Sequence, residues 1–182
     1  MEQELSAAAG GRSITSRMLG AASLDIATYE NVEHDTTATG QAAAVVGIVA
    51  VCAAIGGIGS GSGAIIGGLI SAYLGWLVWA GVTYLIGDKL LGGTATWGEL
   101  LRTLGFAQTP GVLRIFGFIP FLGWLVTLIA GIWMLVTGIV AIRQALDFST
   151  GKAILTAVLG MVAYFLVVAL LVAIGGVGGM LT

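Results

Sequence analysis

The stretch of the chain from Val45 to Gly87 contains no carboxylate, ammonium or guanidinium group. A helix needs ~20 apolar residues to cross ~30 Å of hydrocarbon, so this stretch is too long for one crossing and about right for two. The sequence GSGSG, from Gly59 to Gly63, divides it. Glycine and serine end helices, and glycine also permits positive φ angles. The stretch therefore predicts two antiparallel membrane helices joined by a tight polar turn.

The composition also indicates that lipid is the solvent. Hydrophobic residues make up 58% of the chain and charged residues 9%, compared with roughly 25% charged residues in soluble domains. A soluble domain needs far more polar surface than this sequence offers. The net charge of -2 argues against nucleic acid as a partner, because nucleic-acid binding usually requires a basic surface. Cys52 is the single cysteine, so no internal disulfide is expected.

The fold is predicted to be all-α, an integral membrane bundle of five helices with cytoplasmic amphipathic helices at its amino-terminal end. Residues 1–35 form the predicted amino-terminal segment, and residues 36–182 form the membrane domain. The predicted spans cover residues 42–58, 64–86, 97–118, 121–142 and 153–174. In the amino-terminal segment, Ser13 and Asp25 are expected to cap two short interfacial helices.

The third span is the least regular of the five. Its apolar part, residues 106–118, is short, carries Arg114, contains Pro110 and is followed by Pro120. A run of this length is more typical of a re-entrant or interfacial segment than of a span. However, Thr96 and Glu99 have the spacing of a capping box, which predicts a helix from Trp97 to Phe118 with a kink at Pro110. The first half of that helix could instead lie along the cytoplasmic interface.

The basic residues favour five crossings with a cytoplasmic amino terminus. With five crossings, six of the seven basic residues fall on one side of the membrane, and the opposite connections carry no charge. The positive-inside rule then places that side in the cytoplasm and the carboxyl terminus outside the cell. The predicted location is the inner (plasma) membrane. The six residues are Arg12, Arg17, Lys89, Arg102, Arg143 and Lys152.

Two rows of small residues mark candidate packing faces. One row, on the second span, consists of Gly63, Gly67, Ser71 and Gly75, and the other, on the fourth span, includes Gly123 and Gly131. Small residues at this spacing allow the backbones of two membrane helices to approach closely. The second span could pack in this way against the first, through Gly47 and Ala50 or Ala54. The same faces could instead dock another membrane subunit or a second copy of the chain.

Arg114 is the most notable single residue, because a charge inside a span costs ~2.5–3.5 kcal/mol on insertion scales. The ordinary outcomes are that the side chain extends to the cytoplasmic face or pairs with Asp88, Glu99 or Asp147. The alternative is a contact with a lipid headgroup or an ion. A proton or ion pathway would also need several carboxylates or histidines within the spans, and the predicted spans contain no histidine and one carboxylate, Glu99 in the first turn of the third.

The sequence predicts no catalytic residue, no cofactor and no metal site. His34 lies near Glu30, Glu33 and Asp35, a pattern that is more typical of a solvated helix face than of a metal site. The sequence STGKA, at residues 149–153, lacks the upstream glycine and the preceding strand of a phosphate-binding loop. No set of residues suited to nucleophilic catalysis is available. The protein is therefore not expected to be an enzyme.

Three segments of the sequence resemble bacterial members of the Yip domain family. They are SLDIATYENVEHDTTATGQA before the first span, GGTATWGELLRTLGFAQTPGVL around the start of the third, and STGKAILTAVLG at the start of the last. The resemblance implies a five-span membrane protein with a cytoplasmic amino terminus. It implies no binding residues, because the matched positions are explained as caps, turns and packing contacts. These positions are Tyr29, Gly93, Glu99, Leu104, Gly105, Pro110, Gly151 and Lys152.

Three functions are consistent with the sequence. The first is a non-enzymatic scaffold or accessory subunit, packed against other membrane subunits through its glycine-rich faces. The second is a small channel or carrier, or a lipid-binding protein, that uses Arg114. The third is a homo-oligomeric protein that shapes membranes.

Overall fold

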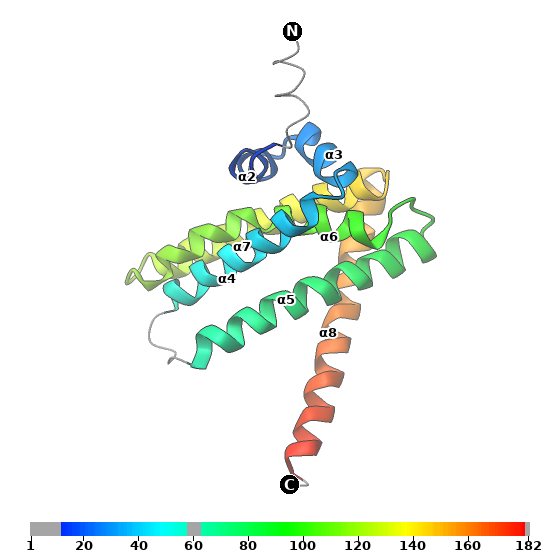
Figure 1. Ribbon diagram of the computed structural model, residues 1–182. Helices are drawn as coiled ribbons and strands as arrows, with labels where there is room; N and C mark the ends of the chain where they lie inside the picture. Colours follow the sequence, from blue (N-terminus) through cyan, green and yellow to red (C-terminus); the bar gives the residue numbers. More distant parts are fainter. Residues whose placement is uncertain (1–11, 58–62, 181–182) are drawn as a thin grey trace.

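The computed structural model describes residues 12–57 and 63–180, and this part of the chain is helical without any strand (Figure 1). The predicted all-α fold is therefore confirmed. The predicted turn at Gly59 to Gly63 falls largely outside the described residues. The helices are α2 (Ile14–Ala22), α3 (Ile26–His34), α4 (Ala38–Gly56), α5 (Gly63–Tyr84), the π-helix η1 (Leu85–Leu90), α6 (Trp97–Ala107), the 3₁₀-helix η2 (Thr109–Phe118), α7 (Gly123–Ala145) and α8 (Thr150–Met180).

Four helical segments in the described residues are long and apolar enough to cross a membrane. They are Ala38–Gly56, Ile66–Leu90, Gly123–Ala145 and Thr150–Leu170. The predicted third span is not among them, because residues 97–118 do not form a single kinked helix. The α-helix α6 ends before Pro110, and the chain continues as η2. Proline has no N–H and its ring clashes with the preceding turn, so it ends the α-helix here instead of bending it.

The α6–η2 segment nevertheless runs along α4 in the same direction. A Cβ atom on Gly105 would lie 2.8 Å from the Cβ of Ala42, and one on Gly111 would lie 2.6 Å from a methyl group of Val49. Eleven α-helical and ten 3₁₀ residues advance the chain by about 16 Å and about 20 Å respectively. The segment therefore has the reach for the predicted third crossing.

Three glycines bring α4, η2 and α7 together at one end of the bundle. A Cβ atom on Gly56 would lie 1.8 Å from the carbonyl oxygen of Arg114, and one on Gly117 would lie 3.1 Å from that of Gly56. A Cβ atom on Gly123 would lie 2.0 Å from the carbonyl oxygen of Gly117. Since real Cβ atoms do not approach backbone atoms so closely, only glycine fits at Gly56 and Gly123. We call Gly56, Gly117 and Gly123 the glycine junction.

The polar connections gather at the other end of the bundle, which we call the charged end. Thr96 and Glu99 form the predicted capping box, with a 2.7 Å hydrogen bond from the Thr96 N–H to Glu99 Oε2 and one of 3.3 Å from the Glu99 N–H to Thr96 Oγ1. The Thr94 hydroxyl donates to Asp147 at 2.8 Å, which joins the connection before α6 to the one after α7. Lys152 Nζ donates to the carbonyl oxygen of Leu91 at 3.3 Å. Two connections distant in sequence therefore meet here.

Helices α2 and α3 begin where the sequence predicts. Ser13 Oγ accepts a hydrogen bond from the N–H of Ser16 at 3.2 Å, as expected of a cap. Asp25 precedes α3, but its carboxylate accepts from the Thr28 hydroxyl at 2.6 Å and not from a backbone N–H. Both helices pack against α6 and α7. The Trp133 indole donates to the carbonyl oxygen of Ala22 at 2.8 Å, which places the end of α2 beside the middle of α7.

Helix α5 lies beside α4, whereas α8 diverges from the other long helices (Figure 1). The Tyr73 hydroxyl on α5 donates to the carbonyl oxygen of Ala43 at 3.1 Å. Farther along α5, Trp79 contacts Tyr164 of α8 edge to face, with 6.0 Å between ring centroids. Beyond this contact, the second half of α8 stands away from the bundle (Figure 1). This divergence leaves a space between α5, α7 and α8.

Candidate functional site

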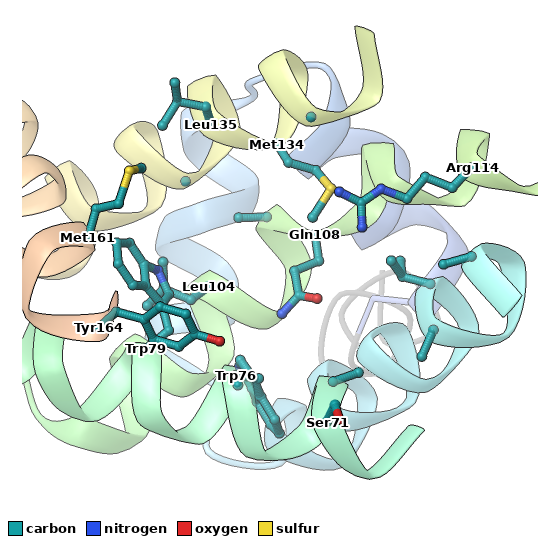
Figure 2. Close-up of a pocket in the computed structure, with 18 of the residues that line it drawn as sticks. Ser71, Trp76, Trp79, Leu104, Gln108, Arg114, Met134, Leu135, Met161 and Tyr164 are labelled. Carbon is teal, nitrogen blue, oxygen red and sulfur yellow. The ribbon is translucent and has the colours of Figure 1, made fainter. Parts of the chain in front are cut away.

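A cavity of about 1260 Å³ lies between α4, α5, α6, α7 and α8 (Figure 2). Its walls are mainly apolar and include Trp79, Leu104, Met134 and Ile139. The cavity exceeds the range of ~300–1,000 Å³ that is usual for small-molecule sites. Its size and apolar walls are suited to a long apolar ligand.

The cavity is open where the helices face the bilayer. Leu135 on α7 and Phe165 on α8 line it and have exposed fractions of 46% and 62%. Ser71 on α5 also lines the cavity and is exposed. A ligand could therefore enter from the side, between α5, α7 and α8, without passing through the charged end.

A few polar side chains point into this apolar space. Figure 2 shows Arg114 and Gln108 reaching into it from η2 and from the end of α6, and Tyr164 and Ser71 on the opposite side. Arg114 follows Gln108 by six residues, and a 3₁₀-helix has three residues per turn, so the two side chains fall on the same side. The 3₁₀ geometry of η2 thus presents a guanidinium and an amide to one cavity.

Arg114 forms no ion pair with Asp88, Glu99 or Asp147, the partners that the sequence suggests. The two ion pairs found among the described residues are Arg17–Asp35 and Lys89–Asp88, and neither includes it. Of its other predicted partners, Glu99 accepts from the Thr96 N–H and Asp147 from the Thr94 hydroxyl. The Nε atom of Arg114 is buried and has no hydrogen-bond partner among the residues that the structure describes.

Arg114 also lies away from the charged end of the bundle. Its carbonyl oxygen packs against Gly56, at the end of α4 that lies away from the charged end. A straight helix starting at Trp97 would place Arg114 roughly 18 Å beyond Arg102. Because η2 has a longer rise per residue than an α-helix, it carries Arg114 about 3 Å farther, to the glycine junction.

A second cavity, of about 980 Å³, meets the first at Arg114. It lies between α4, η2 and α7, and the glycine junction forms part of its wall. Gly131, one of the predicted packing residues on α7, lines both cavities and has open space where a Cβ would be. Gly123, the other, packs against Gly117. The residues described as lining the two cavities include no carboxylate, so Arg114 has no counter-charge there.

The predicted small-residue row on α5 is only partly in contact with the rest of the chain. Gly63 is the first residue of α5. A Cβ atom on Gly67 would meet nothing within 4 Å, and Ser71 is exposed. A Cβ atom on Gly75 would lie 3.1 Å from the Tyr164 hydroxyl. The described contact between α5 and α4 is made through Tyr73, whose hydroxyl would lie 2.6 Å from a Cβ on Gly47.

The acidic group near the end of α3 is not the uniformly solvated face that the sequence predicts. Ligand atoms of Glu30, Glu33 and His34 lie within 4.8 Å of one another, and Glu33 is 9% exposed. Burial, with the nearby Glu30 carboxylate, raises the pKa of Glu33 to about 7. Acceptance of a hydrogen bond by the backbone of Glu30 raises the pKa of His34. Exposed acidic groups at such distances are common in proteins without a bound ion, so the arrangement is not evidence for a metal site.

Two buried arginines at the charged end were not predicted as structural residues. Arg17 is 1% exposed and donates to Asn31 at 3.1 Å and to Gln41 at 2.9 Å, besides its pair with Asp35. Arg102 is 6% exposed and donates to the carbonyl oxygens of Val32 and Glu33. The sequence does carry a signal for Arg17, because Ile14, Met18 and Ala21 share its face of α2.

Comparison with known proteins identifies the family. No curated protein and no solved structure matches the chain. Residues 26–172 match the family model described as the Yip1 domain. This match begins at the first residue of α3 and includes both α6–η2 and the four long apolar helices. The chain belongs to the Yip1 domain family and is a multi-pass membrane protein.

Proposed function

We propose that this protein is a non-enzymatic scaffold or accessory subunit that binds other membrane helices through α5. The observation that carries the proposal is the open surface at Gly67 and Ser71. Both residues are exposed, and a Cβ atom on Gly67 would meet nothing within 4 Å. A glycine inside a helix costs about 1 kcal/mol relative to alanine. Close approach of a partner helix is the usual compensation within membranes.

The surroundings of this surface support a helical partner. Ile66, Ile70 and Leu74 lie on the same side of α5 and have exposed fractions of 67%, 56% and 56%. Large apolar side chains beside small ones form the ridge and groove into which a second membrane helix packs. The partner would be another membrane subunit or a second copy of the chain, and the latter corresponds to a homo-oligomeric, membrane-shaping role.

The proposal includes the topology of the chain. The membrane domain, residues 36–182, would cross the inner membrane five times, with α6–η2 as the third crossing. The charged end would face the cytoplasm and the glycine junction the exterior. The distribution of basic residues supports this orientation, since Arg17, Arg102 and Lys152 all lie at the charged end.

Substitution of Gly67 by leucine tests the scaffold role. The full chain is purified from membranes in a mild detergent, and the co-purifying proteins are identified by mass spectrometry. Gly67→Leu should reduce the recovery of partners about tenfold or more, because a bulky side chain prevents close helix approach. Gly81→Leu is the matched control on the same helix, since Gly81 also has open space around it.

The outcomes separate the possible partners. Other membrane proteins lost in Gly67→Leu and retained in Gly81→Leu would support the accessory subunit. A homo-oligomer lost in the same way would support self-association. Recovery of the wild-type chain as a monomer without partners would contradict the scaffold proposal.

A further inference from the structure

We propose that the cavity around Arg114 binds a membrane phospholipid, with the headgroup phosphate at Arg114 and Gln108 and an acyl chain along the apolar walls. This inference does not rest on the scaffold proposal, because its evidence is the environment of Arg114 inside the bundle; Ser71 is the one residue that belongs both to the cavity lining and to the open surface at Gly67.

Arg114 brings a charge without a counter-charge into the cavity. The Nε atom of Arg114 is buried without a hydrogen-bond partner among the described residues, and the described lining of both adjoining cavities offers no carboxylate. An arginine within a membrane domain usually pairs with another group or marks a binding site. We infer that the missing counter-charge comes from a ligand.

The hydrogen-bond donors at Arg114 and Gln108 indicate the chemistry of that ligand. A guanidinium is planar and presents its N–H donors in a fork that matches two oxygens of a phosphate. Gln108 adds an amide N–H₂ on the same side of the segment (Figure 2). Together they offer donors to an anion with several oxygens.

The volume and lining of the cavity indicate that the ligand also has a large apolar part. Its volume of about 1260 Å³ is far more than an inorganic anion needs, and most of its lining is aliphatic or aromatic. Trp76 and Trp79 line the wall on α5, and Met161 lines the wall on α8. A ligand that satisfies both the guanidinium and these walls is an amphiphile with an anionic head.

The cavity is accessible from the side of the bundle, between α7 and α8. Leu135 and Phe165 are exposed at the rim between α7 and α8. In a bilayer these residues face the lipids, so a phospholipid is the amphiphile at highest local concentration. It can enter sideways without leaving the membrane. We therefore assign the cavity to a phospholipid and not to a free anion.

The test measures lipid retention by the isolated full chain. The protein is delipidated in detergent, incubated separately with dioleoylphosphatidylglycerol and with dioleoylglycerol, and the bound lipid is counted by native mass spectrometry. The two lipids share their acyl chains and differ in the phosphate headgroup. The wild type should retain phosphatidylglycerol at least about tenfold better than diacylglycerol, as a charge-assisted fork of hydrogen bonds requires.

Variants locate the headgroup. Arg114→Gln should reduce that preference to near unity, whereas Arg114→Lys should retain part of it, since lysine keeps the charge without the fork. Gln108→Leu, which leaves the charge in place, should lower the preference several-fold. The matched control is Arg143→Gln, because it removes one positive charge from α7 outside the cavity, and it should bind as the wild type does.

Two results would overturn the proposal. One is an unchanged preference for phosphatidylglycerol in both Arg114→Gln and Gln108→Leu. The other is displacement of the lipid by millimolar inorganic phosphate alone, which would indicate a site for a free anion. Thermal unfolding and size-exclusion profiles confirm that each variant is folded. If Arg114→Gln does not fold, Arg114→Lys and Gln108→Leu decide the question.

Discussion

Arg17 on α2 forms an ion pair with Asp35, the residue that ends α3, and the arginine is almost completely buried. The same guanidinium donates to Asn31 and to Gln41, so one side chain joins α2, α3 and α4. The amino-terminal helices are therefore attached to the membrane domain by polar contacts as well as by apolar packing. This attachment has measurable consequences.

Loss of Arg17 should destabilise the fold. Arg17→Ala removes one partner of a largely buried ion pair, which typically costs about 3 kcal/mol because the other charge stays behind without compensation. The free energy of unfolding in detergent micelles measures the effect. Arg12→Ala is the control, since Arg12 is exposed and makes one hydrogen bond, of 3.4 Å, to Thr28; it should cost less than about 0.5 kcal/mol. Equal costs for the two variants would contradict the role of Arg17.

The same pair predicts an acid limit of stability. Hydrogen bonds from Thr37 and then from Arg17 lower the pKa of Asp35 from 3.8 to about 2. A group with a lowered folded-state pKa stabilises the fold fully above its unfolded pKa and loses this contribution as the pH falls. The wild type should therefore lose stability between about pH 4 and pH 2, and Asp35→Asn should show a smaller loss over that range.

Glu33 should make the free energy of unfolding fall as the pH rises, which is the opposite of the effect of Asp35. Its pKa is raised from 4.5 to about 7, mainly by burial. Between these values the folded protein holds a proton that the unfolded chain releases, so stability falls as the pH rises. Glu33→Gln should remove this part of the slope. Glu30→Gln, at an exposed neighbour, should keep most of it; a wild type with flat stability over this range would refute the raised pKa.

The glycine junction should tolerate no side chain. Gly56→Ala would place a Cβ atom 1.8 Å from the carbonyl oxygen of Arg114, a backbone atom. The required backbone shift should cost about 3 kcal/mol, at the upper end for an overpacked core. Gly40→Ala is the matched control in the same helix, where a Cβ atom meets nothing within 4 Å. Helix propensity predicts that this control is neutral or stabilising by up to about 1 kcal/mol.

The topology is open to a labelling experiment. In a chain whose Cys52 is replaced by alanine, a cysteine is introduced by Phe121→Cys or by Ser149→Cys. Phe121 is 96% exposed in the turn after η2, and Ser149 lies at the charged end. A membrane-impermeant maleimide should label Phe121→Cys in intact cells and Ser149→Cys only after lysis. The reverse pattern would invert the proposed orientation.

Most of the fold can be predicted from local signals. The apolar lengths predict four of the membrane helices, and the spacing of Thr96 and Glu99 predicts the start of α6, which the capping box confirms. These features depend on residues close in sequence. The 3₁₀ conformation of η2 depends on tertiary contacts, because its glycines allow it to pack closely on α4 and α7. Hydropathy alone does not distinguish it from an α-helix.

The candidate site is less predictable for the same reason. Arg114 is notable in the sequence, but its surroundings depend on where η2 places it and on the divergence of α8 from α5. Arg17 and Arg102 were assigned to the cytoplasmic side by their charge alone. Their burial follows from the way in which α2 and α3 fold back onto α6 and α7. This arrangement is long-range, and its one local signal is the position of Arg17 on the apolar face of α2.

The 3₁₀ pitch of η2 has a consequence for how such chains are counted. Length-based counting assumes that each residue advances the backbone by ~1.5 Å, and it finds an even number of spanning helices in the part of the chain that the structure describes. The ten residues of η2 advance by ~2 Å each and so cover a comparable depth with less sequence. If that short helix completes a crossing, the number of membrane crossings becomes odd. Anything fused to the last residue would then meet the opposite compartment from anything fused to the first.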